Sequence, residues 1–383
     1  MESNYAADLG KLVIKIYGGL LLLFGLPGNV ISAIIMGGNR SNRLTTRLII
    51  VVLAIADNFV LLTAVLRYWL MEVYSWDLRT TGPFICKIHV FAVGFSTDFA
   101  VGVLCAIAVE RLLVVALPYK ASNLVTLKSV IIGMTCFALS IIVKNSIHFW
   151  MMGENKSSQS RRGLINTYNN NAYITVSENS TEDNLFTCTF ASQYEIVLKI
   201  FMKFDFVSFA VLPYLILFSC NMIIYLKLRK QRRLIRSHAY TISVVNNSNY
   251  NKTINQYDIS NKTQNKIERL SFIQPEVTNL SETKDVRRKR SIRRPEGVIK
   301  LLNVLTIIHV ICTLPGTIFT FLSSYFNYFH DMPEHDQVKF GLVMLIFTNN
   351  AINFFGYFIS STTFRQTVYR MLSHWCQWTN FCH

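Results

Sequence analysis

Charged residues are scarce in this chain, and that scarcity is the first constraint on its fold. Asp, Glu, Lys and Arg make up only 16% of the 383 residues, while hydrophobic residues make up 51%. Soluble domains carry charge on roughly a quarter of their residues. The mean hydropathy is positive, at +0.32. A soluble globule of this size would need more polar surface, so the composition favours a membrane protein.

Several motifs are also absent. None of the eight Cys stands in a CxxC or zinc-type spacing, which argues against a zinc domain. No metal motif or nucleophile elbow lies in a plausible place, so an enzyme is not expected. We see no internal repeat of the kind that transporters show. The apolar stretch from Leu12 to Met36 is too long for the core of a cleaved signal peptide, so we expect it to remain as a membrane span.

Basic residues outnumber acidic residues, and many of the basic residues lie in a single stretch of the chain. The net charge is +16, and 18 Lys and Arg fall in the polar stretch between Lys227 and Lys300. The apolar runs are nearly free of them. A basic cytosolic loop satisfies the positive-inside rule, so no nucleic-acid partner is expected.

Long apolar runs are what the sequence has in abundance. A helix needs about 20 apolar residues to cross a bilayer, and seven segments meet this length. They are 12–36, 48–71, 84–115, 125–149, 196–226, 297–324 and 338–359. The runs lack the alternation of a barrel strand, so we predict an all-α membrane protein with a bundle of seven transmembrane helices.

The loops set the orientation and the domain boundaries. Basic residues follow spans one, three and five, so we expect a multi-pass protein of the plasma membrane with its N-terminus outside. We expect 1–11 to be an extracellular N-terminus, 12–373 the seven-helix domain, and 374–383 a cytosolic tail. The Asn-rich loop at about 227–296 is predicted to be disordered. Two sequons, at Asn155 and Asn179, lie on the outer side as candidate glycosylation sites.

Span three carries a Cys at one end and a charged pair at the other. From Cys86 to Arg111 the helix would rise about 37 Å, a full membrane crossing. Glu110 and Arg111 therefore lie at the cytosolic boundary, within reach of a partner. Cys188 lies in the second outer loop, on the oxidising side. A Cys86–Cys188 disulfide would tie that loop over the mouth of the bundle, and two separate thiols are the alternative.

Short motifs recur in order along the spans: GN at Gly28-Asn29, LAIAD ending at Asp57, ERL at 110–112, LP at Pro213, CTLP at 312–315 and NFFGY at 353–357. With the outer Cys pair, these motifs resemble the rhodopsin-like G-protein-coupled receptors over nearly the whole chain. The resemblance implies an activation network of these and neighbouring positions: Asn29, Asp57, Pro213, Thr313, Pro315, Asn349, Asn350, Asn353 and Tyr357. Phe364-Arg365 matches the start of the family's short amphipathic eighth helix.

The motifs also depart from the family pattern. Thr313 replaces the usual Trp of span six, His309 an aromatic, and Phe354 the usual Pro of span seven, while Asn221 stands where span five usually has Tyr. In the family these positions relay activation, so the departures concern the activation relay and not the fold. NFF in span seven more loosely resembles invertebrate neuropeptide receptors, especially FMRFamide-receptor-like ones.

The resemblance also indicates what the outer pocket accepts. Phe347 occupies the retinal-Lys position of light-sensing members, and Val93 the Asp position of biogenic-amine receptors, so neither class is expected. The ligand-pocket candidates are Arg67, Val93, Asp98, Asp205, Thr317 and Lys339. Asp98 and Asp205 together could hold a cation, for which a peptide bearing Arg would be suited. The alternative is that the two acids satisfy each other through a shared proton or through a partner such as Lys203.

Asp57 and the Asn residues of span seven predict a buried polar cluster. In the family the equivalent cluster holds a sodium ion. Ala100 replaces a hydroxyl there, so sodium at Asp57 and a water-filled network stand as alternatives. No other cofactor is expected.

These observations predict a receptor that binds an extracellular ligand, a neuropeptide by the looser resemblance, and activates a heterotrimeric G protein through Arg111. Arrestin and receptor kinases are the further partners that the family implies. Ser291 in a basic frame is a candidate kinase site, Cys376 and Cys382 are candidate palmitoylation sites, and Pro295 in place of an acid predicts raised basal activity. A chemosensory receptor of the same fold and a membrane transporter are the alternatives.

Overall fold

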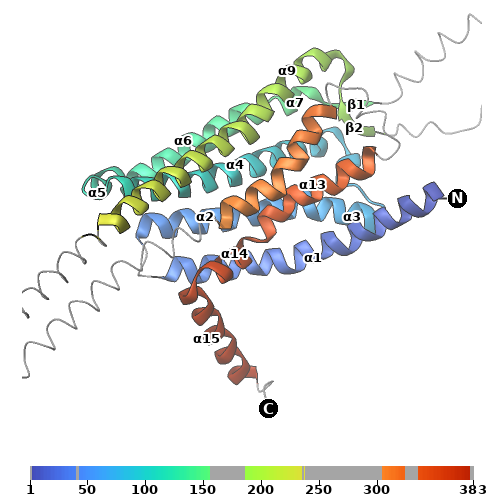
Figure 1. The fold of residues 1–383 in the computed structure, drawn as a ribbon. Helices are drawn as coiled ribbons and strands as arrows, with labels where there is room; N and C mark the ends of the chain where they lie inside the picture. Colours follow the sequence, from blue (N-terminus) through green and yellow to red (C-terminus); the bar gives the residue numbers. More distant parts are fainter. Residues whose placement is uncertain are drawn as a thin grey trace, which may run out of the picture.

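The chain folds as a bundle of long helices that run side by side (Figure 1). The computed structural model describes residues 2–39, 43–155, 186–234, 237, 304–323 and 335–379. Within these residues, six helical stretches are long and apolar enough to cross a bilayer, and a bent pair near the C-terminus makes a seventh if it is counted as one span. The predicted seven-helix bundle is therefore confirmed.

The first four spans follow the predicted segments closely. Span one lies in α1, Glu2–Gly38. Span two, Leu44–Tyr74, is built from α2, Leu44–Val60, a π-helical turn η1, Leu61–Val65, and α3, Leu66–Tyr74. After the short η2, Leu78–Thr81, span three is α4, Pro83–Ala116. The short α5, Ala121–Leu124, leads to α6, Leu127–Asn145, and α7, His148–Met151, which together form span four.

The last three spans depart more from a regular helix. Span five, Glu195–Leu234, begins with α9, Glu195–Phe206, and a second π-helical turn, η4, Val207–Val211. Span six is Val304–Ser323. Span seven joins α13, His335–Ala351, to α14, Asn353–Ser360, with a bend of 50°. The bend occurs although Phe354 stands in place of the usual Pro. Last comes α15, Thr362–Thr379, which turns away from the bundle (Figure 1).

A disulfide-anchored hairpin closes one end of the bundle. Strand β1, Met152–Asn155, pairs antiparallel with β2, Phe186–Phe190, with Met152 opposite Phe190. Cys188 in β2 forms the predicted disulfide with Cys86 at the start of α4, closing a separation of 102 residues. These two strands lie outside the seven apolar runs, for which no strand was predicted.

The interior is packed by apolar side chains and by close approach of backbones. One cluster, which includes Leu53, Leu104 and Tyr357, lies toward the end where α4 finishes, and a second surrounds Leu61 and Phe347. Within a bilayer, helices associate by van der Waals packing, for which small residues allow close contact. Gly25 serves this purpose, because a Cβ there would overlap the side chains of Leu61 and Ala351.

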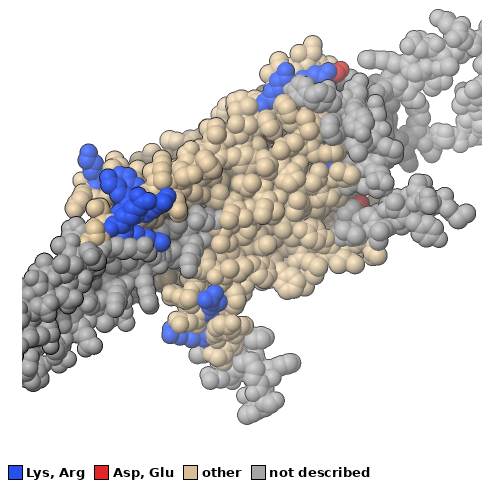
Figure 2. Space-filling view, in the orientation of Figure 1, with Lys and Arg blue, Asp and Glu red and all other residues tan. Residues whose placement is uncertain are grey.

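Lys and Arg gather at the end of the molecule opposite the hairpin (Figure 2). Span five reaches Leu234 there, so residues 227–234 continue the helix rather than beginning the predicted disordered loop. Lys, Arg, Gln and Leu in KLRKQRRL are good helix formers, which explains the extension. Apart from residue 237, the rest of that loop, with Ser291 and Pro295, lies outside the described residues, as do Asn179 and Cys382.

Candidate functional site

The charged pair of α4 is held by the first turn of α2. Glu110 is 4% exposed and accepts hydrogen bonds from Thr46 Oγ1 at 2.7 Å and Thr45 Oγ1 at 3.3 Å. Arg111 Nε lies 3.3 Å from Glu110 Oε2, with the Arg111 side chain 12% exposed. The acid and the base of this pair are therefore in contact with each other. The two threonines were not predicted, because nothing in their local sequence distinguishes them from other hydroxyl residues at a helix start.

A polar cluster lies inside the bundle where spans one, two and seven meet. Asn353 Nδ2 donates to Asp57 Oδ2 at 2.6 Å. Asn29 Nδ2 donates to Asn58 Oδ1 at 3.0 Å and to the carbonyl of Asn350 at 2.9 Å. Asn58 was not among the predicted members. The cluster joins three spans through side-chain amides, which donate and accept at once.

Some oxygen atoms of this cluster have no hydrogen-bond partner among the described residues. They are Asp57 Oδ1, Asn29 Oδ1 and Asn350 Oδ1, all on buried side chains. Carboxylate and amide oxygens suit hard cations and also water. The cluster therefore has oxygen donors of the type that a sodium ion needs, although Ala100 supplies no hydroxyl.

The replaced positions Thr313 of span six and Asn221 of span five each contact the other span. Tyr214 of span five forms a 2.7 Å hydrogen bond with Thr313, whose hydroxyl also donates to the carbonyl of His309. The rings of Tyr214 and His309 lie 5.5 Å apart. Two turns further along span five, Asn221 Nδ2 donates to Thr306 Oγ1 at 2.7 Å. Spans five and six are thus joined by hydroxyl and amide contacts where the family usually has aromatic ones.

Several other predicted site positions are buried among the spans. Thr317 Oγ1 donates to the carbonyl of Thr313 at 3.0 Å, within the turn that contains Pro315. The thiol of Cys105 on α4 lies 4.0 Å from the carbonyl of Pro213. Tyr357 is 2% exposed, with its ring 5.8 Å from that of Phe364 in α15.

At the hairpin end of the bundle, Arg67 forms an ion pair with Asp77, which was not predicted as its partner. Its Nε donates to Asp77 Oδ1 at 2.8 Å and its Nη2 lies 2.5 Å from Asp77 Oδ2, while Arg79 reaches the same carboxylate at 3.2 Å. Burial raises the pKa of Asp77, but the hydrogen bonds from Arg67 and Arg79 outweigh it, so the net pKa lies well below the usual range. This cluster ties span two to the loop that follows it.

Asp98 and Asp205 do share a partner, but it is Lys144 of α6. Lys144 Nζ lies 3.1 and 3.0 Å from the two oxygens of Asp98 and 2.6 Å from Asp205 Oδ1. Asn145 Nδ2 also donates to Asp98, at 2.8 Å. The expectation of Lys203 in this role was wrong. A lone Lys within the apolar run of span four was the available signal, because intramembrane ionisable residues seek a partner.

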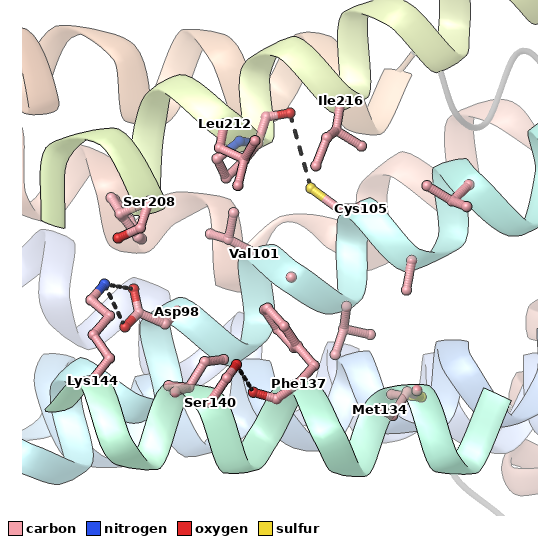
Figure 3. Close-up of a pocket in the computed structure, with 18 of the residues that line it drawn as sticks. Asp98, Val101, Cys105, Met134, Phe137, Ser140, Lys144, Ser208, Leu212 and Ile216 are labelled. Atoms are coloured by element: carbon pink, nitrogen blue, oxygen red, sulfur yellow. Dashed lines mark hydrogen bonds and ion pairs between the residues drawn. The ribbon is translucent and has the colours of Figure 1, made fainter. Parts of the chain in front are cut away.

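Two cavities lie beside the cluster of Asp98, Lys144 and Asp205. A cavity of about 170 Å³ lies between spans five, six and seven and is lined by Asp205, Thr317, Phe206 and Phe321, among others. A larger, mostly apolar groove of about 470 Å³ lies between α4, α6 and span five, with Asp98 and Lys144 at one end (Figure 3). Of the other predicted pocket residues, Val93 packs in the core and Lys339 is exposed on α13; neither lines these two cavities.

Two candidate modification sites fall on described elements. Asn155 ends strand β1 and Cys376 lies in α15, but their side chains are outside the described residues. In α15, Phe364 and Val368 are buried while Leu372 is 54% exposed. The helix therefore buries the first turns of its predicted apolar face.

Comparison with known proteins places these features in a family. Residues 28–357 match the family described as "7 transmembrane receptor (rhodopsin family)". The chain is 24% identical to galanin receptor 2b of Danio rerio over 201 residues, which are 52% of this chain and 50% of that receptor. It is 28% identical to the neuromedin U receptor homolog nmur-2 of Caenorhabditis elegans over 115 residues, 30% of this chain and 28% of that protein. The chain thus spans half the length of one curated relative and about a quarter of the other.

Proposed function

The chain belongs to the rhodopsin family of seven-transmembrane receptors, and from this premise we propose that it binds an extracellular peptide and activates a heterotrimeric G protein. The receptor family decides against the enzyme and the transporter. The observation that carries the proposal is the buried Glu110–Arg111 pair at the end of the bundle opposite the disulfide-anchored hairpin. The disulfide-anchored hairpin closes one end of the bundle. The other end presents Arg111, whose charge can leave Glu110 and pair with a partner outside the chain.

Orientation is part of the proposal. The disulfide between Cys86 and Cys188 belongs on the oxidising side of a membrane. The basic end of span five in Figure 2 belongs on the cytosolic side by the positive-inside rule. The hairpin end then faces outward in the plasma membrane, the N-terminus lies outside, and Arg111 faces the cytosol.

The peptide class is supported by the two relatives, whose names describe receptors for galanin and for neuromedin U. The retinal position is Phe347 and the amine position is Val93, and neither side chain can bind those ligands. A peptide would enter between the outer halves of the spans. Asn155 and Asn179 are then outward-facing glycosylation candidates.

The proposed switch is a population shift. A ligand that binds better to an arrangement with span six swung outward raises the population of that arrangement. The Arg111 side chain then leaves Glu110 and contacts the G protein. A sodium ion at Asp57, held by the oxygen atoms without a partner there, would favour the resting arrangement. Arrestin and receptor kinases would act on the same cytosolic face.

A peptide screen tests this function. Cells expressing the full chain are exposed to a library of amidated neuropeptides, with calcium and cyclic-AMP readouts. At least one peptide should give a saturable response that is lost in Arg111→Ala at equal surface expression. The matched control is Arg365→Ala, at an Arg of α15 that caps the carbonyls of Phe358 and Ile359 and should keep most of the response.

The opposite results are equally clear. A response that persists in Arg111→Ala would refute the proposed coupling. Silence to every peptide together with a response to volatile or water-borne small molecules would refute the peptide ligand and favour the chemosensory alternative.

A further inference from the structure

One cation is shared by two acids in this cluster. Lys144 Nζ lies within ion-pair distance of both Asp98 and Asp205. His148 of α7 is a further titratable side chain that interacts electrostatically with Asp205, and no other ion pair among the described residues reaches either acid. An ionisable group within a membrane span is a functional candidate by default. One ammonium group thus serves two carboxylates at this site.

The two acids are not equally occupied. Both oxygens of Asp98 are engaged, by Lys144 and by Asn145, and its side chain is 9% exposed. Asp205 has a contact from Lys144 on Oδ1 alone, and its side chain is 43% exposed. Figure 3 shows the Lys144 ammonium directed at both oxygens of Asp98. Asp205 is therefore the acid with capacity for a second cation.

The surroundings of Asp205 suit a cationic head group. The cavity of about 170 Å³ beside it is lined by Met202, Phe206, Phe209, Thr317, Phe321 and Ile346. The rings of Phe206 and Phe321 are stacked with their centroids 4.3 Å apart, and aromatic faces attract guanidinium and ammonium groups. Ligand pockets commonly reach about 300–1,000 Å³. This cavity therefore fits one side-chain head group rather than a whole ligand.

We propose that Asp205 is a cation-recognition site, where the guanidinium or ammonium group of a ligand replaces Lys144. Before the exchange, one ammonium is shared by two carboxylates. Afterwards Lys144 remains paired with Asp98, and Asp205 is paired with the ligand. The exchange gives each carboxylate a cation of its own and releases the only ion pair that the described residues show between α6 and span five. The identity of the ligand as a peptide rests on the proposed function.

A binding experiment that needs neither a G protein nor a known peptide tests this site. The full chain, purified in lipid nanodiscs, is heated with increasing arginine amide or with citrullinamide. Both compounds are acetylated on the α-nitrogen, so that arginine amide carries its single charge on the guanidinium and citrullinamide, of similar shape, carries none. Arginine amide should raise the unfolding temperature with a saturable dependence on its concentration, and citrullinamide should not. Asp205→Asn should abolish the effect, and Glu195→Gln, at an exposed acid of the same helix paired with Lys199, should leave it unchanged.

The Lys144 variant distinguishes recognition from a structural ion pair. Lys144→Met removes the internal competitor, so arginine amide should act at a roughly tenfold lower concentration. If the Met variant does not fold, Lys144→Gln, which keeps a hydrogen-bond donor for Asp98, replaces it in the experiment. If neither Lys144 variant folds, the comparison of wild type with Asp205→Asn tests the proposal. Equal effects of the two amides, a response retained in Asp205→Asn, or no response at all would overturn the proposal. Failure of the peptide screen would leave this result untouched.

Discussion

Replacing Glu110 by Gln should raise the signalling of the receptor in the absence of ligand. Gln keeps the size of the side chain and an oxygen that accepts from Thr46, but it removes the ion pair with Arg111. The pair is largely buried, with the two side chains 3% and 12% exposed, so solvent screens it less than a surface ion pair. The proposed resting arrangement should therefore lose stability relative to the active one.

The size of the effect follows from the geometry. A hydrogen bond to a charged group contributes about 1.5–3 kcal/mol, and the 3.3 Å separation of Arg111 Nε and Glu110 Oε2 places this pair at the low end. A change of about 1.4 kcal/mol alters a population ratio tenfold. A receptor that is active about 1% of the time would become active about 10% of the time.

Basal signalling per receptor at the surface measures this change. It should rise severalfold in Glu110→Gln, and Thr46→Val, which removes the 2.7 Å contact, should raise it more than Thr45→Val, which removes the 3.3 Å contact. The double variant with Arg111→Ala should be silent. Unchanged basal signalling in Glu110→Gln at equal surface expression would refute the role assigned to the pair.

Three further outcomes are expected. Cys86→Ser should lose about 4–5 kcal/mol of stability, the entropy of a loop of about 100 residues, seen as a lower unfolding temperature and less receptor at the surface; equal behaviour with and without the Cys188 bridge would contradict this. The depressed pKa of Asp77 gives a stability contribution that is complete above its ordinary value of 3.8 and is lost as the pH falls through the folded pKa. Below about pH 4 the wild-type unfolding temperature should therefore drop more steeply than that of Asp77→Asn, and parallel curves would refute the assignment. Gly94→Ala should cost about 1–3 kcal/mol, because the added methyl would overlap the Asn145 amide oxygen, and an unfolding temperature equal to that of the wild type would show that α6 can shift.

The sequence predicted the spans well because the rule behind them is local. A run of about 20 apolar residues is sufficient to identify a span, and each predicted segment overlaps an observed one. The inner end of span five was placed too early, since Lys and Arg lower hydropathy without ending a helix. The bend in span seven and the hairpin depend on packing and on a disulfide, which hydropathy does not report.

The site was predicted less completely, because side-chain partners depend on three-dimensional neighbours. The predicted positions Glu110, Asp57 and Asn353 do lie in buried contacts. Other partners come from spans whose rotation the sequence does not show: Thr46 for Glu110, Asn58 for Asn29, and Lys144 for Asp98 and Asp205. Arg67 was assigned to the ligand, although ten residues later Asp77 binds it. Asp57 and Asn353 were predicted together, but for Glu110, Asn29, Asp98 and Arg67 the polar or charged group was found and a partner was missed.

The two π-helical turns also make counting along spans two and five unreliable. Each holds one residue more than an α-helical turn needs, so every side chain beyond it is rotated by about 100° relative to a continuous helix. Arg67 lies beyond Leu61–Val65 when counted from Asp57, and Asp205 lies beyond Val207–Val211 when counted from Pro213. Deleting a single residue from either turn would leave the inner half of that span in place and present a different helical face to the ligand. A one-residue deletion or insertion at these turns is thus a simple genetic route by which such a receptor can acquire a new ligand while keeping its G protein.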